Sequence, residues 1–504
     1  MTFRTHSRTH SHERDQDFSD VDRSALLTAL AGVLPAAALL SEHEDLKPYE
    51  CDGLSAYRRL PLAIALPADE AQVVAVLKVC HRLGVPVVAR GAGTGLSGGA
   101  LPHPHGVVLS LAKMKNILRL DALARVAVVQ TGVRNLAISE AAAPHGLYYA
   151  PDPSSQIACT IGGNIAENSG GVHCLKYGLT VHNVLRVRGV TMAGEIVEFG
   201  NEALDAPGYD LLALMIGSEG LLAVVTEVTV KLVPKPEVAR VIMASFDEVI
   251  KAGAAVAEII AAGIIPAGLE MMDKAATAAV EPFVKAGYDL NAAAILLAES
   301  DGTPEEVEEE IAAMRAVLEK SGATDIRVSN DDAERLRFWA GRKAAFPAVG
   351  RISPDYYCMD GTIPRKRLAE MLTAIAAMEK KYALRCANVF HAGDGNLHPL
   401  IMYDANVPGE LERTEAFGVE ILELSVALGG TITGEHGVGF EKVGSMCVQF
   451  NSEELAAFHR VKSAFDPQGL LNPDKAVPTL HRCAEFGRMH VHQGELKHPE
   501  LERF

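Results

Sequence analysis

The stretch Arg90-Gly91-Ala92-Gly93-Thr94-Gly95-Leu96-Ser97-Gly98-Gly99 directly follows the apolar run Val85–Arg90. Glycines let backbone N–H groups approach an anion closely, so the stretch predicts a phosphate-binding loop. Its part from Gly93 to Gly98 also fits the GxGxxG pattern of dinucleotide-binding proteins, in which a helix begins at the glycines. Here the chain runs into Leu101-Pro-His-Pro-His-Gly106 and a further strand instead. We therefore expect a phosphate loop outside a Rossmann unit, with a plain surface loop as the alternative.

Other glycine-rich polar segments follow the first one along the chain. They are Tyr149–Gln156 with Thr160–Gly171, and Gly217–Thr226. Apolar, β-rich runs separate them, so they can meet at one side of a sheet. Three such loops predict a site that wraps one long nucleotide.

Short β-rich runs and one strong helical pattern fill residues 56–236, which we predict to form one strand-rich mixed domain. The helical pattern covers Glu70–Leu83. The expected strands are Leu60–Ala65, Val85–Arg90, Gly106–Leu111, Val126–Gly132, Val184–Val190, Glu195–Phe199 and Leu222–Val233.

Helical patterns become more frequent after Lys235-Pro236, which marks a boundary. Thr303-Pro-Glu-Glu has a capping threonine, proline at the first helical position and acids in the first turn, so it predicts a helix that runs to Lys320. Other expected elements are the helices Val249–Ala262, Arg365–Lys381 and Glu410–Leu428 and the strand Ala292–Glu299. We predict an N-terminal tail with a helical lead-in over 1–55, an α+β domain over 237–385, a returning C-terminal segment over 386–478 and a flexible tail over 479–504.

Composition excludes some classes of function. The net charge of −17 argues against nucleic-acid binding, which leaves a basic footprint. The eight cysteines form no CxxC pair, so neither an iron–sulfur or zinc-ribbon pattern nor a disulfide framework is expected. The N-terminus lacks a secretory h-region, and the apolar run Ala25–Leu40 is short and broken by Pro35, so we expect no transmembrane segment and a cytoplasmic protein. The histidine-rich tail is read as solvated, with metal binding as the alternative.

Histidines and acids cluster in two glycine-rich segments near the C-terminus. His391-Ala-Gly-Asp-Gly-Asn-Leu-His398 places two imidazoles across a turn, and Glu435-His436 follows within Thr433–Gly439. Two imidazoles and a carboxylate suit an open site for zinc, iron or manganese. A single histidine is more often structural, but several in such loops favour metal ligands.

Arg342 lies in Phe338-Trp339-Ala-Gly-Arg342-Lys343, beside the only tryptophan of the chain. A bidentate arginine suits a substrate carboxylate. A solvated basic helix face is the structural alternative, and Lys343 and Arg351 are weaker candidates for the same role.

These motifs, in this order, resemble those of flavoenzymes. Arg90–Gly99, Pro151-Asp-Pro, Thr160-Ile-Gly-Gly-Asn and Gly217-Ser-Glu-Gly are similar to the FAD-binding domain of the vanillyl-alcohol oxidase and p-cresol methylhydroxylase type. The C-terminal motifs resemble the FAD-linked oxidase domain of D-2-hydroxyacid dehydrogenases. The resemblance covers residues 20 to 478. It implies an α+β fold: a two-subdomain FAD-binding domain, a ferredoxin-like α+β cap (substrate) domain and a helical C-terminal segment.

The resemblance also assigns roles to residues. His391, His398 and Glu435 would bind a divalent metal (Zn, Mn or Fe), His436 would be the catalytic base, and Arg342 would bind the substrate carboxylate. The residues implied to bind FAD are Arg90, Gly91, Ala92, Gly93, Thr94, Gly95, Pro151, Asp152, Ser154, Gly162, Gly163, Asn164, Asn168, Gly170, Gly171, Glu219, Gly220 and Asn472. Thr94 stands where some members attach FAD through histidine, so FAD is expected to be dissociable, although His173 and Cys174 are near in sequence.

The expected reaction is the oxidation of a small 2-hydroxyacid to the 2-oxoacid. Relatives that act on D-2-hydroxyglutarate carry a threonine and a lysine where this chain has Phe346 and Tyr357. Neither residue is cationic, so a monocarboxylate such as glycolate or D-lactate is favoured over a dicarboxylate. A non-catalytic FAD-binding subunit is the alternative from another class. The resemblance further implies an iron–sulfur partner subunit, a quinone acceptor and a position at the inner face of the membrane.

Overall fold

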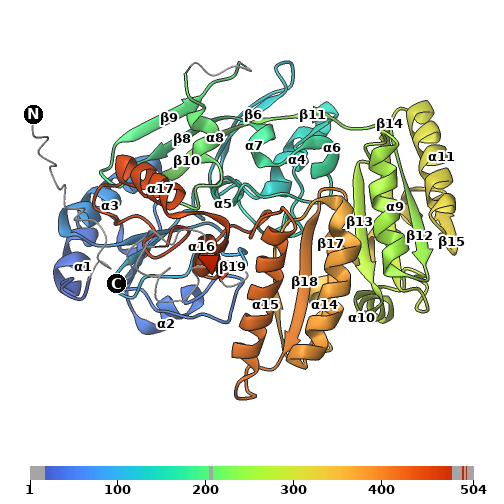
Figure 1. Ribbon diagram of the computed structural model, residues 1–504. Helices are drawn as coiled ribbons and strands as arrows, with labels where there is room; N and C mark the ends of the chain where they lie inside the picture. Colours follow the sequence, from blue (N-terminus) through green and yellow to red (C-terminus); the bar gives the residue numbers. More distant parts are fainter. Residues whose placement is uncertain (1–17, 204–207, 479–490, 493–494, 497–504) are drawn as a thin grey trace, which may run out of the picture.

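A computed structural model describes residues 18–203, 208–478, 491–492 and 495–496. The helices and strands form two halves, one holding β1 to β11 and the other β12 to β18, with the last helices returning to the first half (Figure 1). The N-terminal tail up to residue 17 and most of the histidine-rich tail lie outside the described residues. Within that tail only β19 (Val491–His492) and β20 (Glu495–Leu496) are described, and they pair with each other.

The first half contains a four-stranded sheet in the order β1-β2-β4-β3, in which β2, β4 and β3 run parallel. Helix α3 begins after the Asp69 cap, whose side chain accepts from Gln72 N, and ends at Gly84 in the left-handed conformation. It spans the predicted residues. The elements are α1 (Arg23–Ala31), β1 (Leu39–Leu40), α2 (His43–Leu46), β2 (Ala63–Ala65), α3 (Glu70–Leu83), β3 (Val87–Arg90) and β4 (Val107–Ser110).

A five-stranded antiparallel sheet in the order β5-β6-β10-β8-β9 completes this half. Its strands are β5 (Ile117–Asp121), β6 (Val126–Gln130), β8 (Val184–Val190), β9 (Ile196–Gly200) and β10 (Val224–Lys231), and the small pair β7 (Leu147–Tyr148) and β11 (Val233–Pro234) lies beside it. The helices here are α4 (Asn135–Ala142), α5 (Ile161–Glu167), α6 (Cys174–Tyr177), α7 (Thr180–Asn183) and α8 (Leu211–Met215).

The glycine segments behave differently from one another. No helix follows β3, since the chain passes through the loop to β4, so the prediction of a loop outside a Rossmann unit is confirmed. The second segment was expected to be a loop throughout, and this is wrong for Ile161–Glu167, which form α5. The Thr160 side chain caps that helix by accepting from Gly163 N, and Asn168 ends it in the left-handed conformation.

The second half is built on a seven-stranded antiparallel sheet in the order β15-β12-β14-β13-β17-β18-β16. The first four strands in that list have the βαββαβ connection of a ferredoxin-like unit, with α10 inserted, and β17, β18 and β16 widen the sheet. The strands are β12 (Val238–Phe246), β13 (Gly268–Asp273), β14 (Ala294–Gly302), β15 (Asp325–Val328), β16 (Asp355–Cys358), β17 (Arg385–His391) and β18 (Asn396–Tyr403). Strand β17 crosses the boundary that we predict at residue 385, so the sheet has no break there. The division into domains at this residue stays a prediction.

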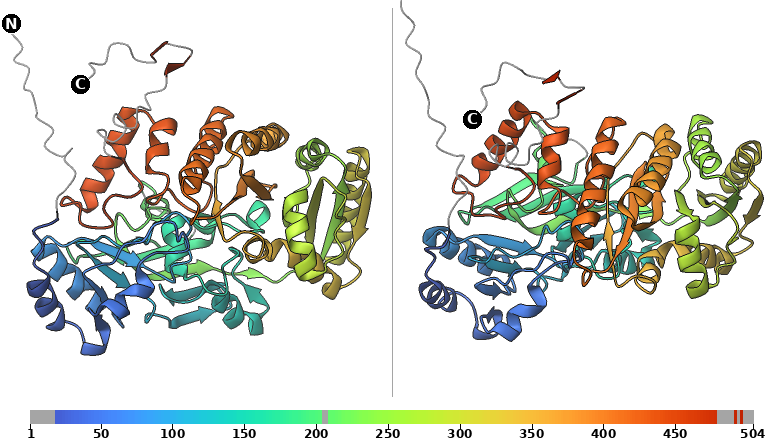
Figure 2. Two further views of the ribbon diagram at one scale, coloured as in Figure 1. Left: turned by 90° about the horizontal axis from the view of Figure 1, so that it is seen from below. Right: turned by 60° about the horizontal axis from the view of Figure 1, so that its bottom comes forward.

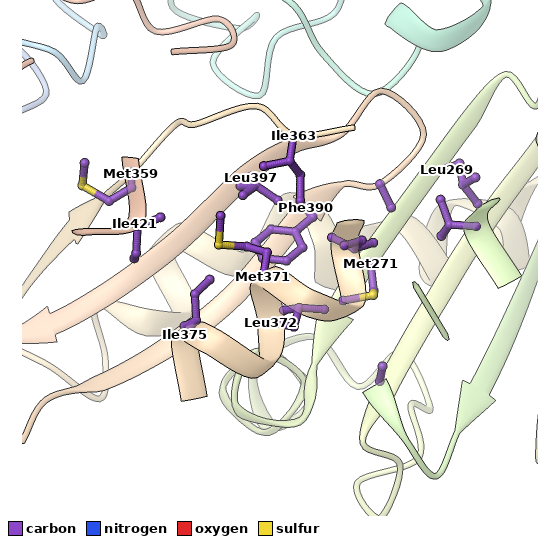
Figure 3. Close-up of a cluster of buried hydrophobic side chains, with 14 of the residues drawn as sticks. Leu269, Met271, Met359, Ile363, Met371, Leu372, Ile375, Phe390, Leu397 and Ile421 are labelled. Atoms are coloured by element: carbon purple, nitrogen blue, oxygen red, sulfur yellow. The ribbon is translucent and has the colours of Figure 1, made fainter. Parts of the chain in front are cut away.

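Successive side chains of the strands point to opposite faces of this sheet and form a hydrophobic layer on each face. One face packs against α9 (Val249–Ala261), α11 (Pro304–Lys320), α14 (Leu368–Tyr382) and α15 (Glu410–Ala427). The other face packs against α10 (Lys274–Val284), α12 (Asp332–Lys343) and α13 (Ala345–Val349). Figure 3 shows part of the first layer, where Phe390 of β17 lies among Met371, Leu372 and Ile375 of α14.

The C-terminal segment returns to the first half. Its helices α16 (Met446–Gln449) and α17 (Ser452–Phe465) lie over that half, as both views of Figure 2 show. Val87 N donates to Leu470 O, and Asn472 N donates to Val87 O, so the segment adds a bridge beside β3. Lys462 Nζ donates to Leu221 O and Leu471 O. The edge of the first sheet is thereby closed by residues almost four hundred positions later.

Among the residues that the structure describes, six cysteines carry free thiols: Cys51, Cys80, Cys159, Cys174, Cys358 and Cys386. Cys447 is disulfide-bonded.

We predict that Ile375→Ala lowers the free energy of unfolding by about 2–5 kcal/mol, because Ile375 is fully buried and its removal leaves a cavity. The matched control is Ile250→Ala on α9, where the side chain is 56% exposed and the expected loss is below about 1 kcal/mol. Urea denaturation of the full chain measures both. Equal losses would contradict the packing described here.

Candidate functional site

A cavity of about 360 Å³ lies where the glycine segments of the first half meet the C-terminal motifs. Its wall contains twelve of the residues predicted to bind a cofactor: Arg90, Gly91, Ala92, Gly93, Thr94, Gly95, Ser154, Gly162, Gly163, Asn164, Glu219 and Gly220. The same cavity is also lined by Lys343, Phe346, Pro347, His398, Glu435 and His436. The two groups of motifs therefore face one space, although the sequence alone could not place them together.

The side chain of Arg90, a residue of the cavity wall, lies beside Gly93. Its Nη1 donates to Cys51 O at 2.7 Å, and its guanidinium lies 5.5 Å from the centre of the Tyr49 ring. Gly93 has φ +71°, and a Cβ at this position would collide with the Arg90 guanidinium. The glycine is thus required by both backbone conformation and space.

Six of the predicted cofactor residues do not line the cavity: Pro151, Asp152, Asn168, Gly170, Gly171 and Asn472. Asn472 and Gly170 instead hold residues of the cavity wall in place through hydrogen bonds. Asn472 Nδ2 donates to Gly99 O and Glu219 O, and Gly170 N donates to Glu435 Oε2 at 3.0 Å.

His173 is held between two carboxylates. Its Nδ1 lies 2.8 Å from Asp152 Oδ2, and its Nε2 lies 3.2 Å from Glu299 Oε1 of β14. Burial would lower the pKa of His173, but the two carboxylates raise it well above the usual range. With both nitrogens engaged and the ring outside the cavity wall, His173 joins the two halves of the molecule and is not placed for attachment to a cofactor.

His391, His398 and Glu435 bring three metal-type ligand atoms within 4.8 Å of one another. Glu435 Oε1 lies 3.5 Å from His391 Nε2 and 3.3 Å from His398 Nε2. The ring nitrogens of His398 are buried and find no hydrogen-bond partner among the described residues. Burial would raise the pKa of Glu435, but chiefly the hydrogen bond and charge of His391 lower it to about 2. Unpartnered buried nitrogens beside an ionised carboxylate fit a divalent cation.

Glu270 of β13 orients His391 from behind. Its Oε1 lies 2.7 Å from His391 Nδ1, and its Oε2 accepts from Arg342 Nε at 2.6 Å. A carboxylate on Nδ1 leaves Nε2 free to face the other ligands, the usual arrangement behind a metal-binding histidine. Arg342, predicted to bind the substrate carboxylate, is 1% exposed and does not line the cavity. Its neighbour Lys343 does.

Asp360 fixes the loop that carries Glu435 and His436. Its oxygens accept from the backbone N–H groups of Gly434, Glu435 and His436 at 2.8 to 3.1 Å. Further donors are Thr433 Oγ1, Asn396 Nδ2 and Lys442 Nζ. Burial would raise the pKa of Asp360, but the neighbouring imidazoles of His436 and His398 and the ammonium of Lys442 favour its ionised form and hold the pKa well below the usual range.

His436 stacks on His398, with ring centres 4.8 Å apart and planes 7° apart. Its Nδ1 is buried without a hydrogen-bond partner in the described part of the chain. Burial lowers the pKa of His436 to about 4, so the ring is neutral near pH 7 and able to accept a proton.

Phe346 and Tyr357 lie differently from each other. Phe346 lines the cavity, with its ring centre 6.5 Å from that of His398. Tyr357 turns away, and its hydroxyl lies 3.4 Å from Tyr57 Oη.

Sequence reasoning missed the residues that hold the site in place: Glu167, Glu270, Asp360 and Lys442. Glu167, Glu270 and Asp360 each stand directly between uncharged residues in an apolar or glycine-rich stretch, whereas Lys442 follows Glu441. A buried charge needs a partner, and that isolation was the available signal.

The geometry above is that of a flavin-binding fold with a histidine and carboxylate site at its cavity. Residues 61–200 match the family described as FAD binding domain, and residues 235–476 match the FAD linked oxidases, C-terminal domain. This chain belongs to the family of FAD-linked oxidases. The resemblance drawn from the motifs is confirmed.

Individual relatives narrow the comparison to one kind of subunit. The chain is 63% identical to "Glycolate oxidase subunit GlcD" of Escherichia coli (strain K12) over 490 residues, which is 97% of this chain and 98% of that protein. It is 40% identical to the Bacillus subtilis protein of the same name, over 85% of this chain and 91% of that protein. It is 33% identical to a D-lactate dehydrogenase of Archaeoglobus fulgidus, over 83% and 91%.

Solved structures support the fold. A p-cresol methylhydroxylase with substrate bound superposes with a TM-score of 0.78 at 17% identity, over 92% of this chain and 99% of that one. A 4-ethylphenol oxidase from Gulosibacter chungangensis gives 0.77 at 16% identity, over 91% and 98%. Within the described ranges, no helix has the length and apolar character to cross a membrane.

We predict that Asp360→Asn lowers the free energy of unfolding by about 3–5 kcal/mol, because it removes the shorter ion pair of the buried Lys442 ammonium, which then keeps only Glu441 at 3.7 Å. Glu370→Gln is the matched control, since it removes a carboxylate from an exposed ion pair with Arg367 and should cost about 0–1 kcal/mol. Denaturant titration measures both. A loss for Asp360→Asn no larger than that of the control would show that the loop does not depend on this carboxylate.

Proposed function

We propose that this chain oxidises glycolate to the 2-oxoacid, with FAD as its cofactor and a divalent metal in the site. The observation that carries the proposal is the meeting of His398, Glu435 and His436 with the glycine-rich segments around one cavity. The name of the 63% identical relative supports glycolate as the substrate.

The residues of the cavity wall fit FAD. The loop from Arg90 to Gly95 lies on one side, with Gly162, Gly163 and Asn164 beside it, and glycines leave backbone N–H groups open to a pyrophosphate. Bound FAD supplies an acceptor for two electrons. Thr94 and the fully engaged His173 support a dissociable cofactor.

His391, His398 and Glu435 would hold the metal, with Glu270 fixing the orientation of His391. A metal in this place supplies Lewis acidity, which eases removal of the proton from the substrate hydroxyl. Zn, Mn and Fe all accept two imidazoles and one carboxylate.

His436 acts as the base. Its ring is neutral near pH 7, lines the cavity and stacks on His398, so it meets a hydroxyl held at the metal-binding residues. It takes the hydroxyl proton as the C–H bond breaks, and the hydrogen of that bond leaves with its electron pair as a hydride equivalent, for which bound FAD would be the acceptor.

The carboxylate of the substrate is assigned to Lys343, with the positive charge of the buried Arg342 behind it. Lys343 lines the cavity, and Arg342 lies behind it against Glu270 and His391. The ring of Phe346 occupies the wall beside His398 and offers no charge to a second carboxylate. This favours a short monocarboxylate over a dicarboxylate.

D-Lactate is the second candidate substrate, because several relatives at 33–35% identity are named D-lactate dehydrogenase. A non-catalytic FAD-binding role is disfavoured by the complete set of site residues. The sequence contains no iron–sulfur cysteine pattern, and the relatives named glycolate oxidase subunit GlcD are subunits of a larger enzyme. We therefore propose that the electrons pass to an iron–sulfur partner subunit and then to a quinone. The same partner would hold this cytoplasmic chain at the inner face of the membrane.

We predict that glycolate bleaches the flavin absorbance of the anaerobic holoprotein fastest, ahead of D-lactate, with L-lactate and D-2-hydroxyglutarate much slower. His436→Ala should slow bleaching by glycolate about 10²–10⁴-fold while flavin stays bound, because the base is lost. Stopped-flow absorbance measures the rates, and the exposed His145→Ala is the control. Fast bleaching by His436→Ala would assign the base elsewhere, and a holoprotein indifferent to every hydroxyacid would refute the function.

We predict that His398→Ala removes most of the bound metal, since His398 offers an otherwise unpartnered buried nitrogen to the ion. Elemental analysis of the purified protein gives the metal content per chain, with the exposed His43→Ala as control. Metal content equal to that of the unaltered protein would exclude His398 as a ligand.

A further inference from the structure

Glu167 is a carboxyl group in the cavity wall that the proposed chemistry leaves unused. It is the last residue of α5 and is partly accessible from the cavity. Its Oε2 is buried and has no hydrogen-bond partner among the residues that the structure describes. An ionised carboxylate with an unsolvated oxygen is costly, so this group calls for an explanation.

The carboxyl lies between two loops of the site. Gly437 has φ +79°, and a Cβ there would collide with Glu167 Oε2. On the other side, a Cβ on Gly99 would lie 3.0 Å from Glu167 Oε1. Glu167 is therefore pressed against the residue that follows His436, and Oε1 is the oxygen left for the cavity.

The charges around Glu167 favour its neutral form. Glu219 lies nearby, and burial raises its pKa, but its two oxygens accept from Val438 N at 2.7 Å and Gly439 N at 2.6 Å, which favours its charged form. Burial raises the pKa of Glu167 well above the usual range, with Glu219, Asp52 and Asp360 acting in the same direction and Lys442 opposing them.

A neutral carboxyl has an O–H to donate, and the cavity is the direction left open to it. The base His436 must stand beside the substrate carbon, which must in turn stand against the redox-active ring of the cofactor. The residue next to His436, Gly437, touches Glu167, so the isoalloxazine end of FAD is the acceptor within reach.

We propose that Glu167 is a protonated carboxylic acid that donates a hydrogen bond from Oε1 to the isoalloxazine ring of FAD. It is thus a cofactor-contacting residue that favours the reduced, more electron-rich ring. The inference rests on the proposed function only in placing that ring beside His436.

The test measures the redox equilibrium of bound FAD without any hydroxyacid, so it is independent of the substrate assignment. The holoprotein and its variants are reduced chemically at pH 7 in the presence of a reference dye. Glu167→Ala should shift the ratio of oxidised to reduced FAD toward the oxidised form by on the order of tenfold, the worth of one such hydrogen bond. Glu167→Gln keeps a neutral donor of the same shape and should stay near the unaltered protein.

Glu441→Gln is the matched control, because Glu441 is another buried carboxyl without hydrogen-bond partners in the described residues but does not line the cavity. It should leave the ratio unchanged. If Glu167 were an anion, both of its variants would shift the ratio toward reduced FAD, which would overturn the proposal. Unchanged ratios in both Glu167 variants would overturn it as well.

An infrared difference spectrum keeps the proposal testable if Glu167→Ala fails to fold or to bind FAD. Oxidised-minus-reduced spectra of the holoprotein should contain a carboxylic-acid C=O band that is absent from Glu167→Gln and retained in Glu441→Gln. A spectrum without that band would contradict the protonated state.

Discussion

The site depends on one buried carboxylate. Asp360 gathers the N–H groups of three consecutive residues, Gly434 to His436, and pairs with the buried ammonium of Lys442. A short loop with glycines on both sides has little stiffness of its own, because glycine leaves the backbone free to move. The charge of Asp360 supplies that stiffness by giving each successive amide a fixed acceptor. Glu435 and His436 can therefore point into the cavity while their backbone faces away from it.

The two halves of the molecule meet through charged groups as well as through apolar residues of the first half, such as Leu54, Leu221 and Val172, that join the core of the second. Asp301 of β14 accepts from Lys176 Nζ and Tyr177 Oη, while His173 lies between Asp152 and Glu299. Gly170 N of the first half reaches Glu435 Oε2 of the second. Polar contacts of this kind are directional, so they set the distance and angle between the cofactor loops and the histidines more closely than apolar packing would.

Local signals in the sequence determined much of the fold. The ends of α3 follow from the Asp69 cap and the left-handed Gly84, and α11 begins with the predicted cap at Thr303. The flavin fold and the histidine motif were also predictable, because each of the motifs that identify them is one contiguous stretch of sequence. The roles of Asp360 and Glu270 were not, since each acts on residues more than seventy positions away through contacts that leave no local pattern. For the same reason the sequence could identify Arg342 as a cation but not foresee that Glu270 holds it behind the cavity wall. The helix α5 was missed because its glycines argued for a loop, whereas the Thr160 cap decided otherwise.

The bridge between Val87 and Leu471 has a consequence for biosynthesis. During translation β3 emerges early, yet its outer edge stays unpaired until almost the whole chain has left the ribosome. Asn472, which holds the backbone of Gly99 and Glu219 in place, arrives equally late. The cofactor loops are thus synthesised first and braced last, so the nascent protein cannot present a finished nucleotide site. Cofactor loading then becomes one of the final events of maturation, and an incomplete chain exposes an open sheet edge that can pair with another chain.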